Sequence, residues 1–511
     1  MAVSGKSDFF QTSGLGSSPV ANLGPVSTSD ISTNANTGDL RRRYNFGDRV
    51  SELSIAQDPF FRFVSKVSKK PTDDPTFKFT EKRSSFHKRY AYVGAVYDGS
   101  AFDDDSDIGA AKSAGDNLKV RMITDYKNDG LQQNIYGNTS NEIKIGASGT
   151  MPKFFLPDQL IKIPTNASAA GGSPDDYMVA KVNTVTEYSG AGSYNDATTT
   201  SSNNPDMVEL SCTVVKAGGR YLTATVSIDD ASTVTPSDDV IHSALEPMRC
   251  YVVGTAHGEG TGYPETWKDQ PYSQSYGITQ IFKTSMAMTN TARATVLKYE
   301  PNEWARVWKE KLIEHKWDIE QSLLFGSQSE TYGTTQGAVD YVLSYGNQFS
   351  LDTATKTADD FLDDMSSFLD PRYNNGASTM FFVSTAVYNW MHKLGGYFKN
   401  NLEISSNFRA DFAMTGKKKV MGVDITTFST PYGDMNVARN IHLDGTNVKM
   451  LGLNMKYCAY RPLVGNGVNR DTSVYVGVQT LENSGIDSRV DLILTEAGME
   501  WCCPETHAVW K

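Results

Sequence analysis

EWARVWKEKLIEHKWDIEQSLLF, residues 303–325, is the stretch of sequence that decides the fold. Its apolar residues recur every three or four positions, which predicts one amphipathic helix. The apolar stripe consists of Trp304, Val307, Trp308, Leu312, His315, Ile319 and Leu323. Asn302 can cap the start and Gly326 follows the end, and at ~1.5 Å per residue the helix would be about 35 Å long. The opposite side carries Lys316 and Glu320 at i,i+4 spacing, so we expect it to face water or a partner.

The residues just before this helix alternate between apolar and polar. In ITQIFKTSMAMT, residues 278–289, the side chains of Phe282, Thr284, Met286 and Met288 fall on one face of an extended chain. We therefore predict a strand here, as one arm of a long hairpin.

The last third of the chain mixes helices and strands. Thr357, with Asp360 three places on, predicts a capped helix, and its apolar stripe is Phe361, Leu362, Met365, Phe368 and Leu369. A buried strand at 379–383 then precedes a helix at 385–394 that ends at the pair Gly395-Gly396. Further strands are expected at 419–428, 435–438, 449–454, 473–481 and 489–495.

Residues 100–265 form a β-rich block. Candidate strands lie at 118–124, 142–145, 159–163, 177–185, 207–215, 221–228 and 250–255. Polar, turn-rich stretches separate them, which is typical of a small antiparallel sandwich or barrel. We interpret this block as an inserted domain.

The amino-terminal residues differ from the rest. Residues 1–40 are rich in Ser, Thr, Gly, Asn and Pro, so they cannot bury enough apolar surface to offset their ordering entropy. They are either a flexible arm that a neighbouring subunit orders or a simple tail. In 48–70, Pro59 interrupts or starts a helix, and strands are expected at 77–80 and 90–96.

Composition narrows the class of protein. At 511 residues, two or three domains are expected. The net charge is −11, with +4 in residues 1–100 and −15 in the rest, which opposes nucleic-acid binding by the chain as a whole. The basic clusters at 41–43 and 66–70 are short, so we favour contacts with acidic surfaces of neighbouring subunits over contacts with DNA. No apolar run has the length of a signal peptide or a membrane span.

A search for catalytic or metal-binding motifs finds none that is convincing. None of the seven histidines forms a His-Glu-x-x-His pattern, and the five cysteines contain no Cys-x-x-Cys pair. The acidic run at 103–107 lacks the Gly and Glu of a calcium loop, since those places hold Ile108 and Ala114. The glycines of 258–262 are not followed by a phosphate-binding Lys, and Cys502-Cys503 are interpreted as structural thiols. We predict no catalytic residue, no cofactor, no metal and no enzymatic activity.

The order of these elements resembles a known family. Residues 303–326 resemble the spine helix of the major capsid proteins of tailed bacteriophages, which have the Hong Kong 97-type fold, and the alternating strand before it resembles their extended loop. VMGVDITTFSTPYGDMNV at 420–437 and LTEAGMEW at 494–501 resemble a strand pair and the closing strand of the same proteins. The resemblance covers roughly 50–95 and 270–511 and departs at the β-rich block.

The resemblance implies an α+β, Hong Kong 97-like capsid fold with an inserted all-β domain. Its parts would be a flexible amino-terminal arm at 1–50, the start of a peripheral domain at 51–99, the inserted β-rich domain at 100–265, an extended loop at 266–300, and the spine helix with peripheral and axial domains at 301–511.

The function implied is a structural one. Copies would self-assemble as hexamers and pentamers into the icosahedral head of the virion, around double-stranded DNA that they bind without sequence specificity, in the host bacterial cytoplasm. Portal protein and a cement or decoration protein would be partners, and no membrane would be involved. We expect a tile-like carboxy-terminal half whose edges are completed by identical neighbours.

Two other functions stay open at this point. A β-rich phage tail or binding protein would form a small discrete oligomer, such as a trimer. A polysaccharide hydrolase would present two facing carboxylates in a concave pocket.

Overall fold

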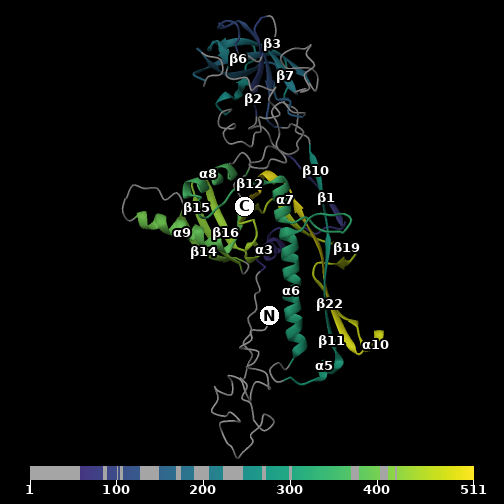
Figure 1. The fold of residues 1–511 in the computed structure, drawn as a ribbon. Helices are drawn as coiled ribbons and strands as arrows, with labels where there is room; N and C mark the ends of the chain where they lie inside the picture. The colour runs from purple at the N-terminus through teal and green to yellow at the C-terminus, as the bar shows by residue number, and fades with distance from the viewer. Residues whose placement is uncertain are drawn as a thin grey trace, which may run out of the picture. The chain divides into compact units, whose positions relative to one another are not determined.

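The structure is a computed structural model (Figure 1) that describes residues 58–83, 89–99, 102–103, 107–126, 149–168, 174–188, 206–222, 246–266, 272–297, 302–369, 374, 379–402, 413–420 and 423–511. Within these ranges helices and strands are mixed, so the predicted α+β class is confirmed. The predicted arm at 1–50 and the predicted strand at 142–145 lie outside the described residues.

The centre of the carboxy-terminal part is a seven-stranded sheet. Its strand order is β12 (Asn347–Phe349), β23 (Ala508–Trp510), β17 (Met450–Asn454), β13 (Thr379–Val383), β16 (Gly433–Arg439), β15 (Val423–Thr430) and β14 (Ala413–Val420). Alternate side chains of β13 enter two separate cores, because Met380 and Phe382 belong to one and Phe381 and Val383 to the other. The helices of this part are α7 (Ala338–Tyr345), α8 (Ala358–Phe368) and α9 (Thr385–Leu402).

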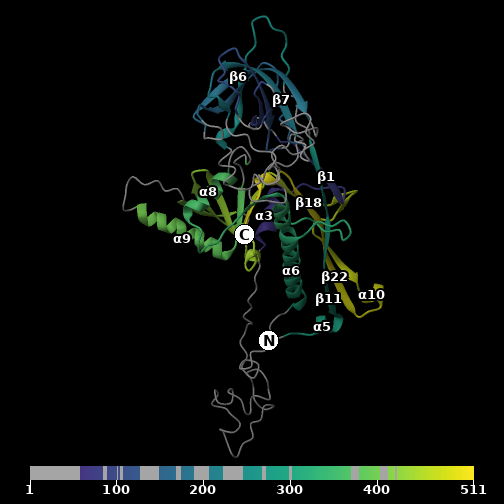
Figure 2. The same cartoon turned by 45° about the horizontal axis from the view of Figure 1, so that its top comes forward.

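A second, four-stranded sheet is built around the long strand β22 (Ser488–Trp501). Strand β11 (Gln280–Thr289) pairs with it on one side, and β18 (Cys458–Pro462) and β21 (Ser473–Gln479) pair with successive parts of its other side. The helix α6 (Glu303–Phe325) runs beside β11 and β22, and the short helices α5 (Asn290–Ala294) and α10 (Leu481–Ser484) lie at one end of this sheet in both views (Figure 2). Near α6 the helix α3 (Pro59–Val67) starts at a proline, as predicted.

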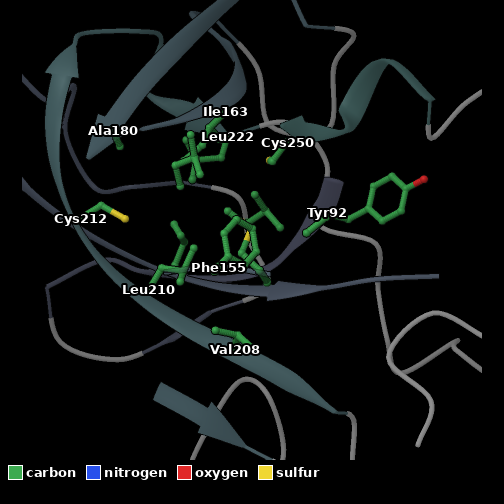
Figure 3. Packing of buried hydrophobic residues seen from close by; sticks show 14 of the residues in the cluster. Tyr92, Phe155, Ile163, Ala180, Val208, Leu210, Cys212, Leu222 and Cys250 are labelled. Carbon is green, nitrogen blue, oxygen red and sulfur yellow. The ribbon is translucent and has the colours of Figure 1, made fainter. Parts of the chain in front are cut away.

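The β-rich block closes into a barrel. Antiparallel pairing runs from β2 (Tyr90–Tyr97) through β4 (Asn117–Ile123), β7 (Met207–Lys216), β6 (Asp176–Tyr188), β5 (Gln159–Asn166) and β9 (Cys250–Thr255) back to β2. The short strands β3 (Phe102–Asp103) and β8 (Tyr221–Leu222) are added to this ring. Figure 3 shows side chains such as Ile163, Leu210 and Leu222 gathered inside it.

The barrel is an insertion in a two-stranded ribbon. Strands β1 (Thr76–Glu81) and β10 (Ser273–Ile278) pair antiparallel, and the whole barrel sequence lies between them in the chain. Strand β2, which precedes residue 100, is one of the strands that close this barrel. The remaining small strands, β19 (Val464–Gly465) and β20 (Val468–Asn469), form a separate hairpin.

Several predicted elements are confirmed within one or two residues. These are the helix at 303–325, the capping box of Thr357 and Asp360, and the strands at 379–383, 250–255 and 207–215. The predicted strand at 221–228 is described only for its first two residues.

Three local predictions are wrong. The helix from 385 does not end at Gly395-Gly396 but continues as α9 to Leu402, because a glycine inside a helix costs only ~1 kcal/mol and Val387 and Met391 already anchor the helix in a core. The single strand predicted at 419–428 spans the end of β14 and most of β15. The strand at 278–288 is no hairpin arm, since it pairs with β22 about 200 residues further on.

Candidate subunit-assembly surface

One face of β11 contacts the helix α6. Phe282, Thr284 and Met286 share one face of β11, as predicted; this face is buried, and the residues between them are exposed. The ring of His315 on α6 lies between two hydroxyls, with Nδ1 2.8 Å from Oγ1 of Thr284 and Nε2 2.8 Å from Oγ1 of Thr495 on β22. Burial lowers the pKa of His315, so a neutral ring links the helix to both strands.

The apolar stripe of α6 is covered over only half its length. Ile319 and Leu323, near the carboxyl end, are fully buried. Trp304, Val307, Trp308 and Leu312, near the amino end, are only partly buried. The guanidinium groups of Arg293 and Arg489 lie 5.4 and 5.0 Å from the ring centre of Trp304, a cation–π arrangement. This half of the helix therefore keeps apolar surface that the described residues of the chain do not cover.

The prediction that Glu320 faces outward beside Lys316 is wrong. Glu320 is completely buried and accepts hydrogen bonds from the backbone N–H groups of Phe60 and Phe61 on α3 and from the side chain of Asn440. A carboxylate can be buried there because these donors satisfy its oxygens. Helical periodicity could not reveal this, since the donors come from distant parts of the chain.

The most exposed apolar surface of the second sheet lies on β21 and the turn after it. It consists of Val474, Tyr475, Val476, Val478, Leu481 and Ile486, hereafter the β21 patch. Val476 keeps 66% of its surface exposed and Leu481 52%. Among the described strands, β21 pairs only with β22, so its other edge carries backbone groups that have no strand partner there. An apolar, unpaired strand edge is a surface on which another chain can pack or pair.

The backbone of the β21 patch is held in place by β22. The pairing register shifts between Tyr475 and Gln479, which marks an irregular, bulged strand. Gly477 has a φ of 68° and its N–H donates to Oδ1 of Asp491, 2.7 Å away. Asp491 also pairs with Arg489. The patch is therefore a built feature of the sheet, with its side chains turned outward.

The histidines considered for catalysis or metal binding make contacts that fit a structural role wherever the structure describes them. His87 and His242 lie outside the described residues. His257 lies 3.5 Å from Asp158, and the ring of His392 packs against Tyr388 and Phe428. His442 Nδ1 meets the side-chain amide of Gln321 at 2.9 Å. Among the residues that the structure describes, His, Cys, Asp and Glu form no group that could hold a metal ion.

The thiols and the acidic run also fit a structural role. Desolvation raises the pKa of Cys503 to about 12 and that of its neighbour Cys502 still further, so both stay protonated and unreactive near neutral pH. Asp107, at the end of the acidic run, forms a bidentate pair with Arg220. In the described part of the chain, no helix combines the length and the hydrophobicity that a membrane span needs.

Comparison with known proteins gives one match that covers most of the chain. The family model for the SU10 major capsid protein matches residues 27–511. No curated protein sequence matches the chain.

Solved structures with similar folds include several phage proteins. A chain from Microbacterium phage Oxtober96 is 14% identical, with 50% of this chain and 80% of that chain covered and a TM-score of 0.34. One from Mycobacterium phage Che8 is 11% identical, covers 51% and 81%, and has a TM-score of 0.31. One from the capsid of the cyanophage P-SCSP1u is 9% identical, covers 50% and 79%, and has a TM-score of 0.33.

Proposed function

The chain belongs to the SU10 major capsid protein family, and from this premise we propose that its copies assemble as hexamers and pentamers into a closed icosahedral shell around double-stranded DNA. The sequence resemblance to tailed-phage major capsid proteins is confirmed by the family match, and forming the phage head is the function of such a protein. The match sets aside the tail-protein and hydrolase alternatives.

The β21 patch is the observation that supports assembly through this part of the chain. A shell subunit must be stable in isolation, and it also needs apolar surface whose burial against another copy lowers the free energy. The β21 patch combines outward apolar side chains with an unpaired strand edge. The half-covered stripe of α6 is a second surface of this kind. We propose that both are buried between copies in the shell.

The domain plan is part of the proposal. Residues 1–50 would be an arm that lies on neighbouring subunits, 51–99 and 301–511 would supply the peripheral and axial domains, and 266–300 the extended loop. The inserted domain, placed at 100–265 from the sequence, would start instead at β2, because that strand closes the barrel.

The proposed partners follow from the same premise. The acidic chain would enclose DNA without sequence-specific contacts, since its net charge of −11 does not favour tight phosphate binding. Portal protein would fill one vertex, a cement protein would bind the outside, and assembly would take place in the bacterial cytoplasm. The role is structural, without enzymatic activity, cofactor or metal.

A single substitution in the β21 patch tests the proposed surface. Val476→Asp places a charge on the exposed edge, where it stays hydrated in the free subunit but must be desolvated between copies. Val253→Asp is the matched control, because Val253 is 61% exposed but lies on the barrel strand β9. Negative-stain microscopy of the expressed full chain would count closed shells for both variants.

We expect wild-type and Val253→Asp chains to form shells and Val476→Asp chains to remain as small particles with an unchanged circular dichroism spectrum. Normal shells from Val476→Asp would remove the β21 patch from the interface. Small discrete wild-type particles under every assembly condition would contradict the shell itself.

A further inference from the structure

The carboxyl half of α6 and the start of β11 border a groove of about 440 Å³, hereafter the α6 groove. Its size lies within the range of about 300–1,000 Å³ that is usual for ligand pockets. The lining combines aromatic side chains with polar ones, namely Phe282, Trp317 and Phe325 with Gln280, Asp318 and Gln321. An apolar surface and a carboxylate therefore meet in one hollow on the outside of the subunit.

Hydrogen bonds and a ring contact hold this lining in place. Oε1 of Gln280 accepts a hydrogen bond from Oγ of Ser322 at 3.1 Å. The side-chain amide of Gln321 meets Nδ1 of His442 at 2.9 Å, and the ring of Trp317 packs edge-on against the same histidine with centroids 4.7 Å apart. Because these side chains are already ordered, a ligand of the α6 groove does not pay the entropy of ordering them.

The carboxylate in the α6 groove differs from its neighbours on the helix. Glu310, Glu314 and Asp318 follow one another at four-residue spacing, at which like charges repel. Glu310 pairs with Arg306 and Glu314 pairs with Lys311. Desolvation and the charge of Glu314 raise the pKa of Asp318, which forms no ion pair with any residue that the structure describes. A cationic ligand would supply the partner that this carboxylate lacks.

One segment of the sequence carries the groups that such a ligand needs. Residues 41–46, which lie outside the described part of the chain, have the sequence Arg-Arg-Arg-Tyr-Asn-Phe, and residues 41–49 carry four arginines and one aspartate, a net charge of +3. An arginine can bind a carboxylate through two N–H groups and can stack on an aromatic ring. Tyr44 and Phe46 add rings that can pack against Trp317 and Phe325.

The second basic cluster of the sequence, at 66–70, has partners within its own chain. Lys69 pairs with Asp471, and Nζ of Lys70 lies 3.8 Å from Oε1 of Glu500. The cluster at 41–43 is therefore the better match for a carboxylate on the surface of another copy.

We propose that the α6 groove binds residues 41–46 of a neighbouring copy, with an arginine of 41–43 on Asp318 and the rings of Tyr44 and Phe46 against the aromatic lining. The inference rests on the proposed function, in which residues 1–50 lie on neighbouring subunits, and it names the surface that receives them. This contact would join two copies without the β21 patch.

Binding of a peptide to the unassembled full chain tests the α6 groove without any shell. The receptor is the chain with Arg41→Gln, Arg42→Gln and Arg43→Gln, so that its own segment does not compete. The ligand is a fluorescein-labelled peptide of residues 38–49, and fluorescence anisotropy measures its affinity. We expect saturable binding, and Asp318→Asn in the receptor should weaken it about fivefold because one ion pair is lost.

Two controls separate the α6 groove from general attraction between charges. Asp363→Asn removes an exposed carboxylate of α8, outside the groove, and should leave the affinity unchanged. A peptide with Tyr44→Ser and Phe46→Ser keeps its charge but loses its rings, so it should bind about tenfold more weakly. The proposal is overturned if the peptide does not bind, if Asp318→Asn binds it as tightly as the parent receptor, or if the peptide without rings binds equally well.

Photo-crosslinking shows which copy supplies the segment. A chain with Phe46→p-benzoylphenylalanine is assembled with an equal amount of isotope-labelled wild-type chain. Crosslinks from position 46 should reach residues 317–325 of labelled and unlabelled copies about equally, whereas crosslinks confined to unlabelled copies would overturn the neighbouring-copy contact. Failure of the two chains to assemble would contradict the proposed function, while the peptide affinities would still decide whether the α6 groove binds the segment.

Discussion

The barrel and the β22 sheet differ in whether their outer strands have pairing partners on both sides. In the barrel, β9 pairs with both β2 and β5, so the ring is closed and its strands have partners on both sides. In the β22 sheet, β11 and β21 each have β22 as their one partner among the strands that the structure describes, and the β21 patch faces outward. The barrel completes itself, whereas the β22 sheet leaves an apolar edge that a copy of the chain can complete.

This difference separates the stability of the folded subunit from the stability of contacts between subunits. The barrel core, including Ile163 and Val182, is fully buried without help from another subunit. The β22 sheet and α6 bury Ile319 and Leu323 but leave Leu312 and the β21 patch at least partly uncovered. Changes in the barrel should therefore affect folding of the subunit, and changes at the β22 edge should affect assembly.

The largest expected effect is on the barrel core. Ile163→Asp buries an unpaired charge and should destabilise the barrel by more than about 4 kcal/mol. Limited proteolysis should then cut within 89–256 while α6 and β22 stay intact. Val215→Asp, on the exposed end of β7, is the control and should leave the barrel resistant. Loss of both parts together in Ile163→Asp would show that they do not fold separately.

The next effect compares the two halves of α6. Leu323→Ala empties a fully buried site and should lower the free energy of unfolding by about 3 kcal/mol. Leu312→Ala, at a partly buried site, should lower it by about 1 kcal/mol in the free subunit. Urea unfolding of both variants measures the difference. Equal losses would mean that the amino-terminal half of α6 is already as well covered as the other half.

A pH effect of intermediate size is expected from His507, which lies outside the barrel. Nδ1 of buried His507 accepts the backbone N–H of Asn454, so Nε2 carries the proton and faces the carbonyl of Cys502. Desolvation lowers the pKa of His507 to about 4. The unfolded chain therefore binds the extra proton first, and stability falls as the pH drops below 6.5. At pH 5 the loss due to His507 alone should be about 2 kcal/mol relative to neutral pH.

The difference between wild type and His507→Asn isolates this effect, because burial raises the pKa of Glu320 to about 7 and Glu320 therefore acts in the opposite direction over a similar range. Between pH 6.5 and pH 5, the free energy of unfolding of His507→Asn should rise by about 1.5 kcal/mol relative to that of wild type, because only wild type loses the contribution of His507. A flat wild-type minus His507→Asn curve would exclude the role of His507.

The smallest expected change in stability belongs to the β21 patch. Val476→Asp should alter the free energy of unfolding of the free subunit by no more than about 0.5 kcal/mol, because the side chain stays in water. Urea unfolding of unassembled protein checks this. A loss above 2 kcal/mol would show that the patch is covered within its own chain.

Local patterns predicted the local elements well. The spacing of Trp304 to Leu323 gave the bounds of α6, and Thr357 with Asp360 gave the start of α8. The alternation of Phe282, Thr284 and Met286 gave the buried face of β11. Each of these signals depends on residues close together in the sequence.

What could not be predicted depends on residues far apart. The partner of β11 is β22, and nothing near residue 280 specifies a strand at 488–501. Glu320 was expected in water because a carboxylate is usually hydrated, and only the N–H groups of Phe60 and Phe61 make its burial tolerable. All residues of the β21 patch except Ile486 lay within a predicted strand, but their exposure depends on β21 having no second partner among the described strands, which no pattern of spacing reveals.

Hydrogen–deuterium exchange of β21 in assembled shells and in unassembled subunits tests the central claim most directly. If copies complete the β22 sheet, the amides of 473–479 become protected on assembly, while those of the barrel strands β4 and β7 exchange at the same rate in both states. Unchanged exchange of β21 in closed shells would contradict this account.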